Sequence, residues 1–118
     1  MLTERYSVTF LGLDPGFHTA RSIADIWEIG ANEVYEETGI YITGSIDANY
    51  IVSQAKSTMD SREISYTIVS IRNPSFTYDD DTYWEAYKRI IEQVRGRLGN
   101  PSMTITKHDV EFYYFIDI

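Results

Sequence analysis

The stretch from residue 40 to residue 72 constrains the fold most, because it predicts both strands of one hairpin. In its first half every second residue is apolar or glycine, and the phase never changes: Ile40, Ile42, Gly44, Ile46, Ala48, Tyr50 and Val52. Successive side chains of a strand point to opposite faces, so this alternation indicates a half-buried strand. A second alternating run contains Ile64, Tyr66 and Ile68, and the polar residues 56–62 between the runs suit a hairpin loop.

The length of the first strand is unusual for a chain of this size. Fully extended, residues 40–56 would span roughly 55 Å, whereas a compact domain of 118 residues is roughly 35 Å across. The strand therefore bends at Gly44, breaks into a turn near residues 47–49, or projects as an arm. The pattern is compatible with one bent strand or with two short strands over residues 40–55.

Two helices are predicted, one on each side of this hairpin. The first has Thr19 as its N-cap and Gly39 as its stop, with one apolar face: Ala20, Ile23, Trp27, Ala31 and Val34. The second begins at Thr82, where Thr82 and Glu85 have capping-box spacing, and ends at residues 99–101. Its apolar face consists of Tyr83, Tyr87, Ile90, Ile91, Val94 and Leu98.

A strand is predicted at each end of the chain. Tyr6, Val8 and Phe10 alternate with polar residues before a turn at residues 14–16, and the last strand alternates over residues 110–118. The element order is therefore β-α-β-β-α-β in a single α+β domain of residues 1–118. This order predicts a ferredoxin-like sandwich, an antiparallel sheet with two helices on one face and a long central hairpin. In that topology the strand from residue 40 lies at a sheet edge.

The composition excludes several functional classes. There is no cysteine, which excludes disulfides, thiol nucleophiles and cysteine-bound zinc. No signal-peptide core and no 18-residue apolar run occurs, so we expect a cytoplasmic protein that makes no membrane contact. A net charge of −8 disfavours direct binding of nucleic acid.

The charge is spread unevenly between the two helices. The first helix is acidic, and Asp25, Glu28, Glu33 and Glu36 are candidate residues for binding a basic protein partner. The second helix is basic, through Lys88, Arg89, Arg95 and Arg97. The alternative is structural, since opposite charge on two neighbouring helices favours their packing.

Aromatic residues provide the second set of candidates. Ten tyrosines are many for this length, and tyrosine is enriched in the cores of interfaces. We expect Tyr113 and Phe115 to share an uncovered, tyrosine-rich sheet face with Tyr41, and Tyr50 to be presented by the hairpin. Such a face points to a homodimer or higher oligomer, formed through the sheet face or the hairpin.

Catalytic and metal-binding patterns are weak. His18 and His108 are the only histidines, and the expected topology brings the end of the first strand close to the start of the last, so the two are candidates for a joint role as acid and base. Residues 79–81 are three consecutive aspartates, which we interpret as a solvated helix start rather than a cation site. No cofactor, metal or catalytic residue is predicted.

The sequence therefore favours a non-enzymatic, acidic protein-binding module. By analogy with small acidic phage and mobile-element proteins, its predicted role is inhibition by occluding a host nucleic-acid-binding complex. One alternative is an oligomeric protein that binds a small, nucleotide-like ligand between subunits. A second alternative is a metal- or histidine-dependent enzyme.

Overall fold

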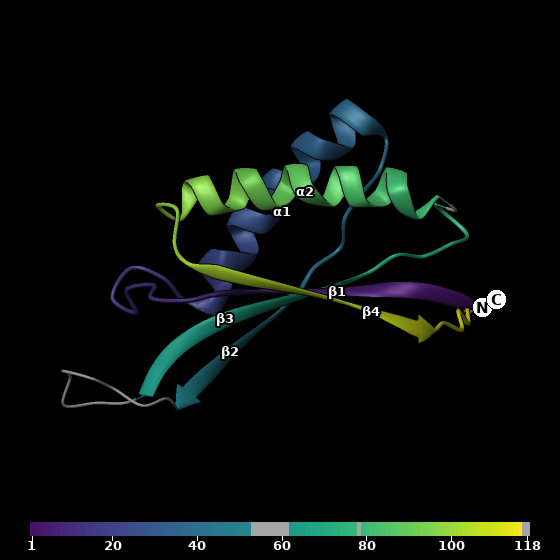
Figure 1. Ribbon diagram of the computed structural model, residues 1–118. Coiled ribbons are helices and arrows are strands. Elements are labelled where there is room, and N and C mark those ends of the chain that lie inside the picture. The colour runs from purple at the N-terminus through teal and green to yellow at the C-terminus, as the bar shows by residue number, and fades with distance from the viewer. Residues whose placement is uncertain (53–61, 78, 117–118) are drawn as a thin grey trace.

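The computed structural model describes residues 1–52, 62–77 and 79–116. Its elements follow the predicted order: β1 (Leu2–Phe10), α1 (Ala20–Thr38), β2 (Ser45–Val52), β3 (Arg62–Ile71), α2 (Asp80–Arg97) and β4 (Met103–Glu111). The sheet order is β2-β3-β1-β4, and all three pairings are antiparallel. Both helices cover one face of the sheet (Figure 1). The predicted ferredoxin-like sandwich is confirmed, with β2 at the sheet edge.

The core lies between the sheet and the two helices. Tyr6, Val8 and Phe10 of β1 are fully buried, as is Ile68 of β3. They meet the apolar helix faces that the 3.6-residue spacing predicts, and burying each large side chain contributes about 1.5–3 kcal/mol.

The first helix is capped as predicted, and the second is not. Thr19 and Ser22 form a reciprocal capping box at the start of α1, and Gly39 ends it at a φ of 75°. The N-cap of α2 is Asp79, which accepts hydrogen bonds from Asp81 N at 3.0 Å and Thr82 Oγ1 at 2.7 Å. The predicted start at Thr82 is therefore wrong, because an aspartate three residues earlier satisfies the free N–H groups.

Strand β2 begins only after Gly44, which lies in close contact with α1. Trp27 Nε1 donates to Ile42 O at 3.1 Å, and a Cβ on Gly44 would lie 2.6 Å from that nitrogen. The segment before Ser45 is thus held under α1 instead of joining the sheet. The turn considered at residues 47–49 is absent, because Asp47, Ala48 and Asn49 all pair with β3.

The hairpin of β2 and β3 extends beyond the layer of helices (Figure 1). The molecule measures 51 × 29 × 28 Å along its principal axes, so the predicted projecting arm agrees with its elongated shape. Of the predicted loop 56–62, residues 56–61 lie outside the described residues, as does Ala55, and Arg62 begins β3.

The predicted tyrosine-rich sheet face is wrong. Strand β4 ends at Glu111, so Tyr113 and Phe115 lie in an irregular segment, where Phe112 N donates to Met1 O at 2.7 Å. The face of the sheet away from the helices is instead marked by threonine contacts, such as Thr9 Oγ1 to Thr67 Oγ1 at 3.0 Å. Within the described residues, no helix has the length and apolar character needed to cross a membrane.

Candidate functional site

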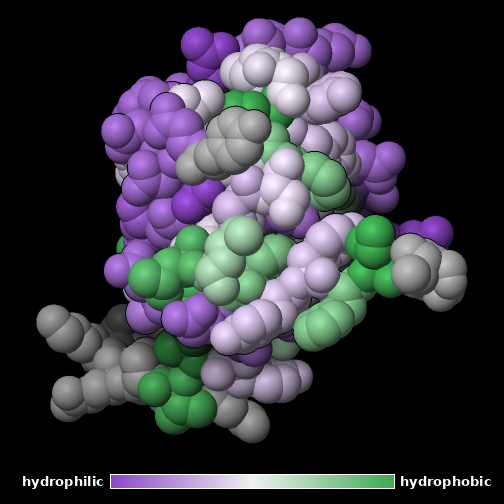
Figure 2. All heavy atoms as spheres, turned by 90° about the vertical axis from the view of Figure 1, so that its right-hand side faces the viewer, coloured by the Kyte–Doolittle hydropathy of each residue, from purple (hydrophilic) through white to green (hydrophobic). Residues whose placement is uncertain are grey.

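A cleft of about 380 Å³ opens at the end of the molecule where the N-terminus lies (Figure 1). Figure 2 looks onto this end and shows hydrophobic side chains gathered below the polar surfaces of the helices. We call it the aromatic cleft, and it is lined by Tyr41, Thr43, Ile71, Asn73, Phe76, Thr77, Tyr83, Phe112 and Tyr114. None of these side chains carries a charge, so the cleft suits a flat, largely apolar group.

Ring contacts hold the walls of the aromatic cleft. Tyr114 packs edge-on against Phe76 at 6.1 Å and stacks on Phe112 at 6.2 Å between ring centroids. Tyr41 packs edge-on against Tyr35 at 6.1 Å. The site is therefore partly formed before any ligand binds, which lowers the entropic cost of binding.

The loop that carries Phe76 and Thr77 is also held in place by the buried ion pair of Arg72 and Glu4. Arg72 Nε donates to Glu4 Oε2 at 2.8 Å, and Arg72 Nη1 donates to Thr77 O at 2.7 Å. The hydrogen bond to Glu4 raises the pKa of Arg72, so its guanidinium stays charged. Thr3 Oγ1 adds a bond to Arg72 O at 2.7 Å.

The back wall of the cleft leads into a stack of tyrosines. Tyr6 lies 5.3 Å from Tyr83 and 4.8 Å from Tyr87 between ring centroids. Burial raises the pKa of Tyr6 to about 12 and raises the pKa of Tyr83 and Tyr87 as well. All three phenols are therefore neutral at physiological pH, which keeps this side of the cleft uncharged.

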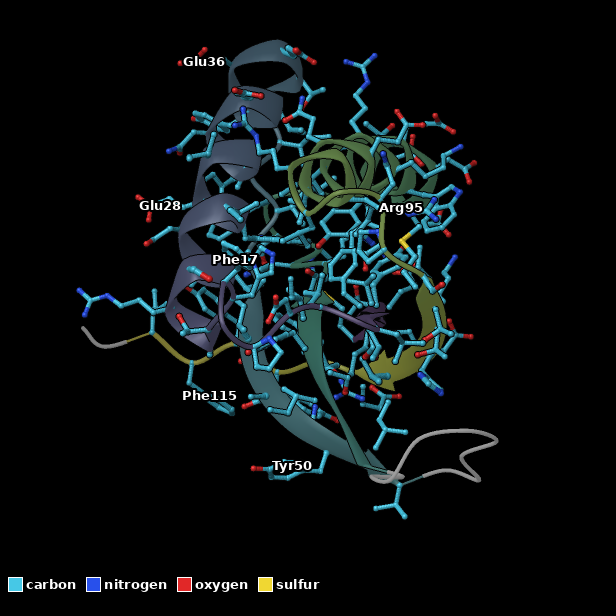
Figure 3. All side chains as sticks on the ribbon, turned by 90° about the vertical axis from the view of Figure 1, so that its left-hand side faces the viewer. Phe17, Glu28, Glu36, Tyr50, Arg95 and Phe115 are labelled. Atoms are coloured by element: carbon cyan, nitrogen blue, oxygen red, sulfur yellow. The ribbon has the colours of Figure 1, made fainter. Side chains whose placement is uncertain are left out.

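A second cleft of about 330 Å³ lies between α1 and the start of β2. We call it the Glu28 cleft, and it is lined by Ala24, Trp27, Glu28, Tyr41, Thr43, Gly44 and Ile46. Tyr41 and Thr43 line both clefts, so the two are neighbours on either side of this segment. Figure 3 shows Glu28 projecting from α1 on the side away from α2.

The acidic residues predicted on α1 fall into two groups, those paired with α2 and those that are exposed. Glu33 pairs with Arg97 at 3.2 Å and Glu37 with Arg89 at 3.1 Å, both across to α2. For these two carboxylates the structure supports the alternative of charged helix packing. Asp25, Glu28 and Glu36 are exposed, and only Glu28 lines one of the two clefts.

The predicted aromatic residues lie in different places, and only one of them lines the two clefts. Tyr41 lines both clefts, whereas Tyr113 and Phe115 are exposed and line neither. Tyr50 is exposed on the projecting hairpin, beside a small hollow of about 140 Å³ (Figure 3). Asn73, Phe76, Thr77 and Tyr114 were not predicted from the sequence, although Tyr114 lies between the predicted residues Tyr113 and Phe115.

The two histidines are not brought together. Tyr66, which pairs with Phe10, donates its hydroxyl to His18 O at 2.8 Å, so His18 lies near that end of β1. His108 pairs with Arg5, five positions along the same strand, which is about 16 Å away. The expected acid–base pair is therefore wrong.

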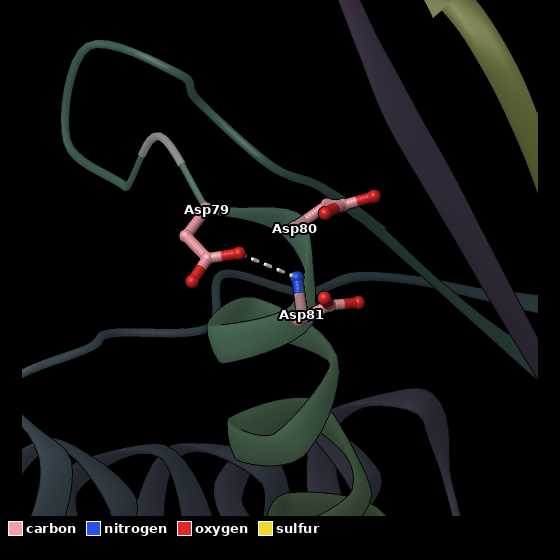
Figure 4. A group of neighbouring side chains, drawn as sticks. All are labelled: Asp79, Asp80 and Asp81. Carbon is pink, nitrogen blue, oxygen red and sulfur yellow. Dashed lines mark hydrogen bonds between the residues drawn. The ribbon is translucent and has the colours of Figure 1, made fainter.

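The three aspartates at the start of α2 have ligand oxygens within 4.8 Å of one another (Figure 4). Both oxygens of Asp79 already accept capping hydrogen bonds, and the bond from Thr82 lowers the pKa of Asp79. The geometry gives Asp79 a capping role, which agrees with the interpretation of this cluster as an acidic helix start.

Comparison with known proteins gives a match along nearly the whole chain. The family profile named SAM lyase matches residues 1–116. A solved phage SAM lyase in the apo state has a TM-score of 0.59 at 13% identity, covering 97% of this chain and 94% of that chain. A phage SAM lyase in complex with S-methyl-5′-thioadenosine has a TM-score of 0.55 at 10% identity, covering 97% and 93%. These two likenesses concern the fold, and no curated protein matches the sequence.

Proposed function

The chain belongs to the SAM lyase family, and from this premise we propose that it cleaves S-adenosylmethionine into S-methyl-5′-thioadenosine and homoserine lactone. The family match over residues 1–116 is the observation that carries the proposal. The match also overturns the prediction of a non-enzymatic protein-binding inhibitor, because a lyase is an enzyme. The two predicted alternatives, a protein that binds a nucleotide-like ligand and an enzyme, are closer to the proposed activity. The predicted histidine pair has no part in that activity.

The proposed reaction is complete within one substrate molecule. A carboxylate oxygen of the substrate attacks its own Cγ, the new C–O bond closes the lactone, and the Cγ–S bond breaks. The sulfur keeps the electron pair and leaves as a neutral thioether. No water, protein nucleophile or proton transfer enters this balance, which explains why the sequence has no recognisable catalytic motif.

Charge disappears as this reaction proceeds. The substrate begins with a positive sulfonium and a negative carboxylate, and both charges are lost in the products. Water stabilises the charged ground state more than the transition state, so moving the substrate into less polar surroundings lowers the barrier. Each 1.4 kcal/mol removed in this way gives about tenfold in rate.

The aromatic cleft provides such surroundings. Its volume of about 380 Å³ falls within the usual range for small-molecule sites. Its tyrosine and phenylalanine rings suit an adenine base by stacking and a sulfonium by cation–π attraction. Thr43, Asn73 and Thr77 are the polar groups of the lining that can orient the substrate.

The test is to incubate the purified protein with S-adenosylmethionine and follow S-methyl-5′-thioadenosine by chromatography and mass spectrometry. Tyr114→Ala, in the cleft, should lower kcat/KM about 10- to 100-fold, the usual effect of one lost base-stacking ring. Phe17→Ala removes an exposed ring that lines neither cleft, and should leave kcat/KM unchanged. No product from the wild-type protein would refute the activity, and equal rates for Tyr114→Ala and wild type would refute the site.

A further inference from the structure

Among the residues that the structure describes, Glu28 is the only carboxylate that lines either of the two neighbouring clefts. It lies on α1, one residue after the buried Trp27, and projects away from α2 (Figure 3). The clefts share Tyr41 and Thr43. A ligand that occupies the aromatic cleft and extends past these two residues therefore reaches the side where Glu28 lies.

The carboxylate of Glu28 has no counter-ion in the part of the chain that the structure describes. Glu33 and Glu37 on the same helix are both paired with arginines of α2. An unpaired carboxylate in a cleft of a protein with net charge −8 favours a cationic ligand group.

The proposed substrate has two cationic groups, a sulfonium and an α-ammonium. A carboxylate beside the sulfonium would stabilise the charge that the reaction removes, and would thereby slow the reaction. The ammonium keeps its charge from substrate to lactone, so binding it has no such cost. The productive arrangement puts the sulfonium against aromatic rings and the ammonium against the carboxylate.

We infer that Glu28 binds the α-ammonium group of the substrate, an inference that rests on the proposed lyase activity. Glu28 then selects the cationic, amino-acid-bearing substrate over the product S-methyl-5′-thioadenosine, which has neither charge. This difference favours release of the product after each turnover.

The first experiment compares Glu28→Gln with two matched variants, Asp25→Asn and Glu36→Gln. Each removes one exposed carboxylate from the same helix, but of the three only Glu28 lines the aromatic cleft or the Glu28 cleft. Glu28→Gln should raise KM about three- to tenfold at unchanged kcat, because ammonium binding is the same in the ground and transition states. The two control variants should keep the wild-type KM. An unchanged KM for Glu28→Gln overturns the inference, and a kcat that rises together with KM places Glu28 at the sulfonium instead.

The second experiment measures the binding of two uncharged-sulfur ligands by calorimetry. S-Adenosylhomocysteine keeps the ammonium and S-methyl-5′-thioadenosine lacks it, so Glu28→Gln should weaken only the former. Equal weakening of both ligands would mean that the variant disturbs the cleft, and would overturn the inference. Binding requires no turnover, so this experiment is independent of the proposed activity. If the wild-type protein binds S-adenosylhomocysteine but does not cleave S-adenosylmethionine, the proposed function is refuted. The comparison of wild type with Glu28→Gln still decides whether Glu28 binds the ammonium group. If the wild-type protein binds neither ligand, both the proposed function and the inference about Glu28 are refuted.

Discussion

Glu4 and Arg72 form a bidentate ion pair inside the protein, in which Arg72 Nε donates to Glu4 Oε2 at 2.8 Å and Arg72 Nη2 donates to Glu4 Oε1 at 3.2 Å. Each residue is only 6% exposed. The pair ties the start of β1 to the end of β3, and Arg72 continues to Thr77 O in the wall of the aromatic cleft. It therefore connects the stability of the sheet with the shape of the cleft.

Removing only one partner of this pair should be costly. Arg72→Met leaves a buried carboxylate without its counter-ion, so we expect about 3–5 kcal/mol of destabilisation in urea unfolding at pH 7. The double variant Glu4→Leu with Arg72→Met removes both charges, and should be closer to the wild type than the single variant. A single variant that loses less than about 1 kcal/mol, the range of surface pairs, would contradict this assignment.

Gly44 is required by the close approach of Trp27. A Cβ at this position would lie 2.6 Å from Trp27 Nε1 and 2.9 Å from Ile68 Cγ2. Gly44→Ala should therefore destabilise the protein by about 1–3 kcal/mol, the usual cost of overpacking, in thermal or urea unfolding.

The control for this variant is Gly96→Ala. Gly96 lies in α2, and a Cβ there meets nothing within 4 Å. Alanine should stabilise the helix by roughly 0.5–1 kcal/mol through backbone entropy. If both alanine variants shift the stability in the same direction, the contact with Trp27 is not the cause.

These residues also show what the sequence could predict. Thr19 and Gly39 act through their own backbone neighbours, so local pattern was enough to place the ends of α1. Gly44 was predicted as one place where the strand could bend, but the glycine is required by a tryptophan 17 residues earlier, which no local rule contains. The aromatic cleft was missed for the same reason, because Tyr41, Phe76 and Tyr114 come from three separate segments that only the fold brings together.

Function was harder to predict than fold for a chemical reason. Sequence motifs identify nucleophiles, acid–base pairs and metal ligands, whereas the proposed lactonisation uses groups of the substrate alone. Glu28 was selected as a partner-binding residue because of its charge. That its carboxylate lines the Glu28 cleft, whereas those of Asp25 and Glu36 do not, depends on the contact between α1 and the segment before β2.

Tyr87 has a buried hydroxyl that makes no hydrogen bond among the described residues. Burying such a group costs desolvation energy that no hydrogen bond offsets, so Tyr87→Phe should stabilise the protein by about 1 kcal/mol. Tyr66→Phe is the matched control, because the Tyr66 hydroxyl donates to His18 O at 2.8 Å and its loss should destabilise. Melting temperatures of the two variants should move in opposite directions, and a lower value for Tyr87→Phe would show that its hydroxyl has a partner.

Alkaline pH should weaken the fold through the tyrosine stack. Burial raises the pKa of Tyr6 from 10.0 to about 12, so the unfolded chain loses this proton at lower pH than the folded protein. The contribution of Tyr6 is fully present below pH 10 and is lost as pH rises through 12. Urea midpoints measured from pH 8 to pH 12 should decline above pH 10, and the decline should be smaller for Tyr6→Phe. Equal declines for both proteins would exclude Tyr6 as the cause.

The edge strand β2 is the remaining candidate for contact with a second copy of the chain. Tyr50 and Val52 are 74% and 72% exposed on this strand, and no strand among the described residues pairs with its outer edge. An exposed edge with apolar side chains favours pairing between chains. We therefore expect native mass spectrometry to find an oligomer of the 13.7 kDa chain, and Val52→Lys to shift it toward the monomer without lowering the melting temperature of the isolated subunit. A wild-type protein that is monomeric at micromolar concentration would contradict this prediction, and an oligomer unaffected by Val52→Lys would place the interface elsewhere.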